Sequence, residues 1–167
     1  MKTCLVGCGG IAAVHGSVLT SGIDTEFVAA ADIKPEKAQS YAENFHTKPY
    51  PSLESMLEAE KPDVLHICTP HYLHVPMAIY SLERNINVFM EKPPAISFDQ
   101  LEELKKAAAK SDAQLGFCYQ NRYNASIRAA KDLIDSGKAG KVLGARAFVT
   151  WCRGAAYYTE SGWRGSL

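Results

Sequence analysis

Short apolar runs recur along the chain and alternate with stretches of helical spacing. The runs at 26–32 and 64–68 are apolar almost throughout, which is typical of parallel strands buried on both faces. Similar runs, each predicted as a strand, lie at 4–6, 86–90 and 114–119. Strands separated by helices need crossover connections, so this order favours a parallel sheet.

The segments between the runs carry the period of amphipathic helices. One stripe after Pro35, at i, i+3, i+4 and i+7, comprises Ala38, Tyr41, Ala42 and Phe45. Further helices are predicted at 11–20, after Ser52 and between 72 and 82. Another begins at a capping box and is predicted to bury Phe98, Leu101, Leu104 and Ala108. The sequence therefore predicts an α/β fold, a doubly wound parallel sheet of the Rossmann type, over residues 1–121.

The pattern changes in residues 122–167. Apolar positions at 127, 130, 133 and 134 indicate a helix that Gly137 ends. Residues 142–151 then alternate, with apolar side chains on one face and Arg146 and Thr150 on the other, as in a half-buried strand.

Composition and charge exclude several classes of function. Lys plus Arg and Asp plus Glu each number 18, so the net charge is zero and neither nucleic acid nor an anionic membrane is an expected partner. We expect no signal peptide and no membrane span, and hence a cytoplasmic protein. Five cysteines without a C-x-x-C pair indicate reduced thiols. His71 and His74 lack completing ligands nearby in sequence, so no metal is expected.

The stretch from Gly7 to Ala12 is the first candidate site. It joins an apolar strand to a helix as Gly7-x-Gly9-x-x-Ala12, the spacing of a dinucleotide-binding turn. Gly7 would make the turn, Gly9 would let a pyrophosphate approach, and Ala12 would let the helix lie close to the strand. The phosphates would lie at the helix N-terminus. The alternative is a glycine-rich loop that binds nothing.

Asp32 follows the second predicted strand, about 20 residues after the glycine turn. A carboxylate there can accept hydrogen bonds from both hydroxyls of an adenosine ribose and would repel a 2′-phosphate. NAD is therefore favoured as the cofactor over NADP. The alternative role for Asp32 is a turn or a helix cap.

Other polar residues also fall where predicted strands end. Parallel strands bring their carboxyl ends to one edge of the sheet, where ligands bind. The residues at such ends are Thr69, Pro70, Glu91, Lys92, Gln120 and Asn121. Their convergence with Asp32 strengthens the interpretation of the glycine turn as a cofactor site.

Several motifs together resemble the Gfo/Idh/MocA family of NAD(P)-dependent oxidoreductases. The matching pieces are Gly7-Cys8-Gly9-Gly10-Ile11-Ala12 with His15, Cys68-Thr69-Pro70 with His71 and His74, Glu91-Lys92-Pro93, and Tyr119-Gln120-Asn121-Arg122-Tyr123. The Glu-Lys-Pro tripeptide at a strand end is the most specific of them. The resemblance implies hydride transfer between the cofactor and a secondary alcohol of a sugar, polyol or nucleotide-sugar.

The resemblance also implies roles for individual residues. Gly7, Gly9, Gly10 and Ile11 would line the pyrophosphate, and Asp32 and Ile33 would flank the adenosine. Thr69, Pro70, His71 and His74 would lie along the cofactor, with Glu91 near its nicotinamide ribose. Lys92 would be the catalytic residue, because an ammonium can stabilise an alkoxide as hydride leaves. His15 is expected to pack on the first helix, and His66 to be a hydrogen-bonded core residue. The Lys92–Pro93 bond is hypothesised to be cis, since the chain must turn sharply there.

Residues 122–167 depart from the family pattern. They resemble only the start of a second, α+β domain that holds substrate, and Tyr157-Tyr158 and Trp163-Arg164-Gly165 resemble its next segment. The chain ends at Leu167, before the family's completing Asp and His. We therefore expect either an enzyme's cofactor half or a non-catalytic NAD-binding sensor or interaction module. A scaffold without ligand is the third reading. The unpaired strand at 142–151 predicts a homo-oligomer formed through residues after about 140.

Overall fold

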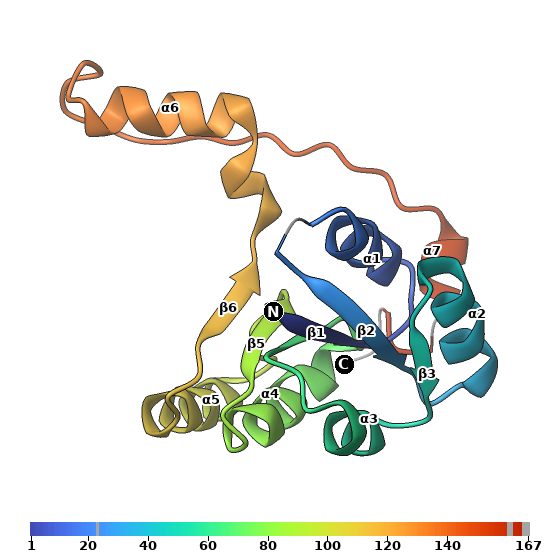
Figure 1. Cartoon of the computed structure of the whole chain (residues 1–167). Helices are drawn as coiled ribbons and strands as arrows, with labels where there is room; N and C mark the ends of the chain where they lie inside the picture. The colour runs from blue at the N-terminus through green and yellow to red at the C-terminus, as the bar shows by residue number, and fades with distance from the viewer. Residues whose placement is uncertain (23, 160–161, 165–167) are drawn as a thin grey trace. The chain divides into compact units, whose positions relative to one another are not determined.

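Six strands form one parallel sheet in the computed structural model, which describes residues 1–22, 24–159 and 162–164. Gly165 and Leu167, named above, lie outside the described residues. The strands are β1 Lys2–Val6, β2 Glu26–Ala31, β3 Lys48–Tyr50, β4 Val64–Ile67, β5 Asn87–Glu91 and β6 Leu115–Cys118 (Figure 1). Their order is β3-β2-β1-β4-β5-β6. Strands β2 and β3 therefore extend the sheet on one side of β1, and β4, β5 and β6 extend it on the other. The predicted doubly wound Rossmann-like fold is confirmed.

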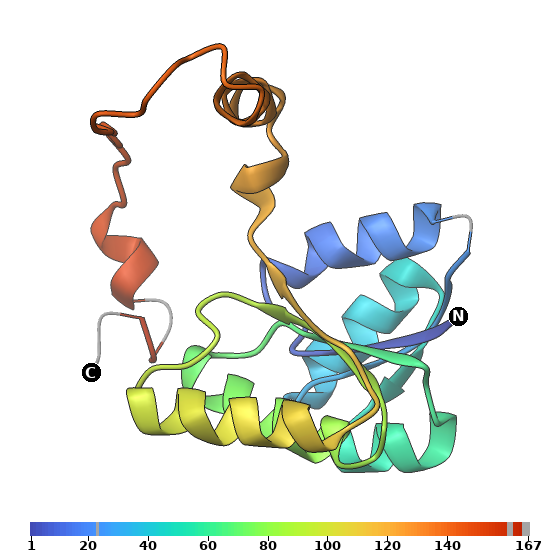
Figure 2. The same cartoon turned by 90° about the vertical axis from the view of Figure 1, so that its left-hand side faces the viewer.

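Helices cover both faces of this sheet (Figure 2). They are α1 Ala12–Ser21, α2 Pro35–Phe45, α3 Leu53–Glu60, α4 His74–Leu82 and α5 Phe98–Lys110. The 3-10 turn η1 His71–Leu73 directly precedes α4. Side chains alternate along each strand between the two faces. In β1, Leu5 packs with Ala12 and Tyr41 from α1 and α2, while Cys4 and Val6 belong to the core on the opposite face.

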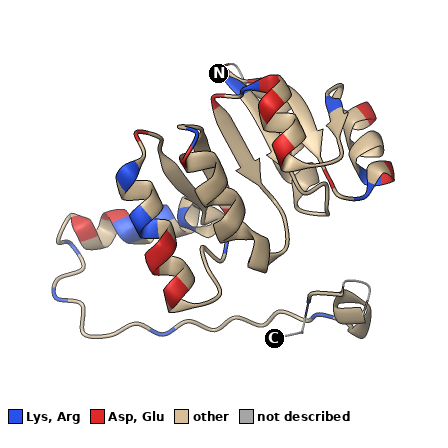
Figure 3. Cartoon of the chain, turned by 90° about the horizontal axis from the view of Figure 1, so that it is seen from below, with Lys and Arg blue, Asp and Glu red and all other residues tan. Residues whose placement is uncertain are grey.

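Residues of both charges occur along the helices and at element ends, while the strand interiors carry none (Figure 3). Within the described residues, no helix combines the length and the apolar character needed to cross a membrane. All five cysteines lie in this part of the chain and form no disulfide.

Helix α1 is held tightly against α2. A Cβ on Gly16 would lie 2.5 Å from the Tyr41 hydroxyl and 2.7 Å from the Phe45 ring, so a larger residue would require these two side chains to move. The Tyr41 hydroxyl donates to the Ala12 carbonyl at 2.7 Å. These contacts fix the N-terminal half of α1, which begins where the glycine turn ends.

One predicted core residue is wrong. Phe98 is 86% exposed, although the stripe it belongs to includes the buried Leu104. Phe98 is the first residue of α5, and the helix becomes buried only further along, where it packs against α4. The periodicity of the stripe was correct, but its first turn extends beyond the core.

The short strand β3 was not predicted. It has three residues with Pro49 in the middle, and a proline cannot donate to a sheet ladder. It is tolerated here because β3 is an edge strand that pairs only with β2.

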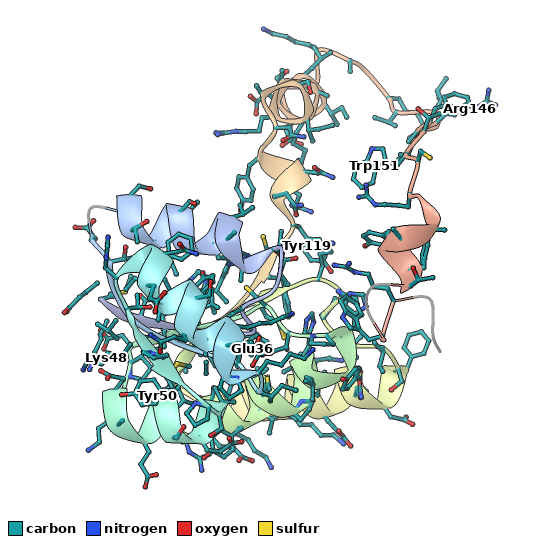
Figure 4. The ribbon with its side chains drawn as sticks, turned by 90° about the vertical axis from the view of Figure 1, so that its right-hand side faces the viewer. Glu36, Lys48, Tyr50, Tyr119, Arg146 and Trp151 are labelled. Atoms are coloured by element: carbon teal, nitrogen blue, oxygen red, sulfur yellow. The ribbon has the colours of Figure 1, made fainter. Side chains whose placement is uncertain are left out.

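A buried carboxylate ties β3 to the rest of the sheet at its amino end. Glu60, at the end of α3, is 5% exposed and accepts from the Tyr50 hydroxyl at 2.6 Å. Its carboxylate also pairs with the ammonium groups of Lys2 and Lys48, each at 2.9 Å. Figure 4 shows Lys48 and Tyr50 on β3, beside α3. Hydrogen bonds from Tyr50, Lys48 and Lys2 lower the pKa of Glu60 to about 2.

Residues 119–167 form a separate unit, whereas residues 1–118 form the sheet unit. The described elements of residues 119–167 are the 3-10 turn η2 Gln120–Tyr123, α6 Ala125–Asp135 and α7 Ala155–Thr159. The predicted helix is present in α6. The strand predicted at 142–151 is not formed, because those residues make no ladder with another strand among the described residues.

Candidate functional site

The glycine turn after β1 presses against the end of β4. Gly7 has φ +93°, and a Cβ there would lie 2.7 Å from the Cys68 carbonyl carbon and 2.8 Å from the Thr69 nitrogen. The Gly7 N–H donates to the Ala31 carbonyl at 2.8 Å, which also joins the turn to β2. Both the conformation and the space therefore require glycine at this position.

Gly9 and Gly10 face open space. A Cβ on either would meet nothing within 4 Å, and both residues are exposed, as is Ile11. Ile11 precedes α1 as its N-cap and provides no side-chain cap for the helix's first N–H groups. An open glycine backbone in front of an uncapped ten-residue helix suits a phosphate group. The described residues thus fit the diphosphate of a dinucleotide.

Asp32 connects the glycine turn to the end of β2. Its Oδ2 accepts from the Cys8 N–H at 2.9 Å, and its Oδ1 accepts from the Lys34 N–H at 2.9 Å, just before α2. The carboxylate therefore does cap a turn, which was the alternative role raised from the sequence. Each oxygen can still accept a further hydrogen bond from a ribose hydroxyl. Ile33, next in the chain, is 82% exposed.

Cys8 lies within the turn as a neutral thiol. Burial, and then the charge of Asp32, raise the pKa of Cys8 to about 12. The turn therefore presents no thiolate to an incoming anion.

The loop after β4 is fixed by a buried histidine. His74 is fully buried, with Nε2 3.0 Å from the Thr69 carbonyl oxygen and Nδ1 2.8 Å from that of Pro93. It thus joins the β4 and β5 ends through their backbones. Thr69 is also buried, whereas Pro70 and His71 are half-buried.

Glu91, Lys92 and Pro93 form the end of β5 and the turn after it. The Lys92–Pro93 bond is cis, as hypothesised from the sequence. The Glu91 side chain is buried and its Oε2 accepts from the Lys92 N–H at 3.3 Å, while Lys92 itself is exposed. A buried carboxylate and an exposed ammonium therefore lie next to each other at the sheet edge.

One histidine contacts Glu91 from another element, and a second histidine contacts the first. His15 of α1 is buried, with Nε2 3.1 Å from Glu91 Oε1 and Nδ1 2.9 Å from His66 Nδ1 on β4. The expected packing of His15 and hydrogen bonding of His66 are confirmed. Sequence reasoning missed that both lead to Glu91. The available signal was their pattern: His15 falls on the buried side of α1, and His66 interrupts an apolar strand.

Electrostatics keep Glu91 ionised despite its burial. Burial acts to raise the pKa of Glu91, but hydrogen bonds from His15 and Cys118, with the nearby charges of His15 and Lys92, lower it overall. Burial first, and then the charge of His15, lower the pKa of His66 to about 4. At neutral pH, Glu91 is a carboxylate and His66 is a neutral ring.

The fold and the residues at the carboxyl ends of its strands together define a dinucleotide-binding domain of the Rossmann class. A family model described as "Oxidoreductase family, NAD-binding Rossmann fold" (GFO_IDH_MocA) matches residues 1–119. The chain belongs to this family, the Gfo/Idh/MocA oxidoreductases, and its Rossmann unit is of the NAD-binding kind.

Named relatives match the chain over nearly its whole length. The D-glucoside 3-dehydrogenase of Escherichia coli K12 is 28% identical over 98% of this chain and 46% of its own length. The WlbA dehydrogenase of Chromobacterium violaceum, solved with NADH and UDP-GlcNAcA, is 31% identical with a TM-score of 0.92, over 99% of this chain and 48% of its own. The Bordetella pertussis WlbA dehydrogenase, solved with the same two molecules, is 30% identical with a TM-score of 0.91, over 99% and 52%. The chain spans about half the length of the relatives it matches.

Proposed function

We propose that the chain is the cofactor-binding half of an NAD-dependent oxidoreductase acting on a secondary alcohol of a sugar, polyol or nucleotide-sugar. The observation that carries this is the open glycine backbone at Gly9 and Gly10, which follows Gly7, packed against Cys68 and Thr69, and Cys8, bonded to Asp32. The relatives whose names include a glucoside or UDP-GlcNAcA support the substrate class.

Each residue has a distinct role in this proposal. Gly7, Gly9, Gly10 and Ile11 receive the diphosphate, and Asp32 with Ile33 holds the adenosine ribose. Thr69, Pro70 and His71 line the path to the nicotinamide, and the buried His74 fixes the loop that carries them. Lys92 is the catalytic residue, whose ammonium would stabilise an alkoxide oxygen and take part in moving its proton. The nicotinamide, when bound, supplies the hydride chemistry.

Replacing Asp32 should separate the two cofactors. Asp32→Ala removes the acceptor for the ribose hydroxyls, so NADH should bind about tenfold or more weakly while NADPH loses less. Fluorescence titration of NADH and NADPH measures both constants. Asp32→Asn is the matched control, because its oxygen can still accept from the Cys8 N–H while the charge that repels a 2′-phosphate is gone. Equal loss of both cofactors in Asp32→Ala would refute the ribose role, and a wild-type chain that binds neither would refute the proposed function.

The second candidate function is a non-catalytic NAD-binding sensor or interaction module, which would hold the cofactor with the same glycine turn and Asp32. Turnover on a panel of sugars and inositols, with Lys92→Ala as the inactive control, distinguishes the two. NADH binding without any turnover that depends on Lys92 would favour the sensor.

We further propose that residues 122–167 begin a C-terminal domain for substrate and for association between copies of the chain. Apolar side chains are strongly exposed there, with Leu143 at 90%, Phe148 at 83% and Trp151 at 71%. Sedimentation velocity should show a mass that rises with concentration, and Leu143→Lys with Trp151→Lys should reduce it. A monomer at all concentrations would contradict this.

A reducing, cytoplasmic location fits the absence of disulfides among the five cysteines.

A further inference from the structure

A series of buried and part-buried polar contacts runs from β4 through α1 to the end of β5. His66 Nδ1 lies 2.9 Å from His15 Nδ1, and His15 Nε2 lies 3.1 Å from Glu91 Oε1. Glu91 Oε2 then accepts from the Lys92 N–H at 3.3 Å. Four polar groups from three elements are thus joined, and His15 is the link between the helix behind the glycine turn and the Glu-Lys-Pro segment.

If NAD binds along the carboxyl ends of the strands, the strand order would bring these contacts close to its nicotinamide end. Asp32 follows β2 and the glycine turn follows β1, so adenosine over β2 and diphosphate over β1 direct the nicotinamide half over β4 and β5. Neighbouring strands lie about 4.8 Å apart, so this edge spans the length of a dinucleotide in a few strands. His66 and Glu91 belong to β4 and β5.

His15 is one of three hydrogen-bond donors to the Glu91 carboxylate, beside Cys118 and the Lys92 N–H. The carboxylate is 5% exposed and remains ionised. A buried carboxylate that loses a hydrogen-bond donor is strongly destabilised and rearranges or takes up a proton. His66, neutral at neutral pH, meets the other nitrogen of the His15 ring, and Phe89 packs against both rings at centroid distances of 6.0 and 5.1 Å. The His15 ring is therefore held with Nε2 directed at Glu91.

We propose that His15 is a positioning residue for the nicotinamide half of the cofactor, acting through the Glu91 carboxylate on Glu91-Lys92. This rests on the proposed function, since it assumes that NAD occupies the edge. It assigns to α1 two tasks at once: its N-terminus faces the diphosphate, and its second turn fixes the residues at the reacting end.

A matched pair of variants tests the proposal. His15→Gln puts an amide nitrogen near the position of Nε2 and can still donate to Glu91. His15→Asn puts its amide near the position of Nδ1, toward His66, and leaves Glu91 without this donor. We expect NADH to bind His15→Asn about tenfold more weakly than wild type, with His15→Gln within about threefold of it.

ADP-ribose, which lacks the nicotinamide, separates positioning from a structural role. If His15 acts only at the nicotinamide end, ADP-ribose should bind all three proteins within about twofold, because the diphosphate contacts are unchanged. Equal weakening of NADH and ADP-ribose in His15→Asn would show that His15 merely holds α1, and would overturn the proposal. Unchanged NADH binding in His15→Asn would also overturn it. Wild-type protein that binds neither probe would overturn the proposed function instead.

A measurement on the wild-type chain covers the case in which His15→Asn does not fold. The His15 Nε2 proton, buried against Glu91, should give a downfield NMR signal that NADH shifts and ADP-ribose does not. A signal indifferent to both ligands contradicts the proposal.

The same groups have a second chemical reading. His15, Glu91 and Cys118 each offer a ligand atom within 4.8 Å of the others, a donor set that Zn²⁺ accepts. The proposed hydrogen-bonded relay, His66–His15–Glu91, needs no metal. NADH affinity should therefore be the same after treatment with EDTA and should fall when Zn²⁺ is added. Loss of NADH binding with EDTA, restored by Zn²⁺, would overturn the relay in favour of a metal centre.

Discussion

Gly7→Ala should abolish measurable cofactor binding and destabilise the Rossmann unit by about 2–4 kcal/mol. The new Cβ would stand 2.7 Å from the Cys68 carbonyl carbon, and alanine would have to adopt φ +93°. The backbone of the β4 loop cannot retreat without disturbing Thr69, whose carbonyl lies against the buried His74. Strain and overlap therefore act together on the turn that would receive the diphosphate.

Gly9→Ala is the matched control for that experiment. Nothing lies within 4 Å of its added Cβ and its φ is not positive, so the thermal midpoint should remain near that of wild type. Its NADH affinity should still fall, because the methyl group enters the space offered to the diphosphate. Thermal unfolding followed by circular dichroism, with NADH titration, separates the two effects. A Gly7→Ala protein as stable as Gly9→Ala would show that the β1–α1 turn is not tightly packed.

Glu60→Gln should cost about 2 kcal/mol of stability at pH 7 and remove much of the chain's sensitivity to acid. The neutral amide would leave Lys2 and Lys48 without their counter-charge. It would also weaken the hydrogen bond that the Tyr50 hydroxyl donates to residue 60. In the wild-type chain this bond is the main reason why the pKa of Tyr50 is raised to about 12. These contacts hold the edge strand β3 against α3 and β1.

The pH dependence of this effect follows from the direction of the shift. The pKa of Glu60 falls from 4.5 to about 2 on folding, so its contribution is complete above about pH 4.5 and is lost as the pH drops toward 2. The difference in unfolding free energy between wild type and Glu60→Gln should shrink over that window. Urea unfolding at several pH values measures it, with Glu58→Gln, an exposed glutamate on the same helix, as control. A gap that stays constant down to pH 2.5 would contradict the assigned pKa.

The sheet could be predicted because its strands are buried on both faces. Runs such as 26–32 and 64–68 have no polar face, so their apolar character alone marks them, and the strand–helix alternation then fixes a parallel sheet. The edge strand β3 escaped because it is short, contains Pro49 and pairs on one side only. Phe98 was misplaced because periodicity gives a helix face but not the point along the helix where burial begins.

The site could be predicted in outline because its residues follow strand ends, where topology brings them together. The partners of those residues could not. His15 and Glu91 are 76 positions apart, and the 3.1 Å contact between them arises only when α1 packs on the sheet. Nothing in local spacing indicates that His74 bonds backbone carbonyls on two loops. Such contacts belong to tertiary structure.

The hydrogen bond from Cys8 to Asp32 has a consequence for redesigning cofactor preference. A change toward NADP calls for replacing the acidic residue after β2, yet here that residue also supports the phosphate-binding backbone at 2.9 Å. Replacing Asp32 alone by a cation would attract the extra phosphate but would remove the acceptor for the Cys8 N–H and so loosen the glycine turn. An engineered switch in this scaffold needs two substitutions: a small acceptor such as Ser or Asn at 32 to keep the Cys8 contact, and a cation at the exposed position 33, beside the native Lys34, to meet the extra phosphate.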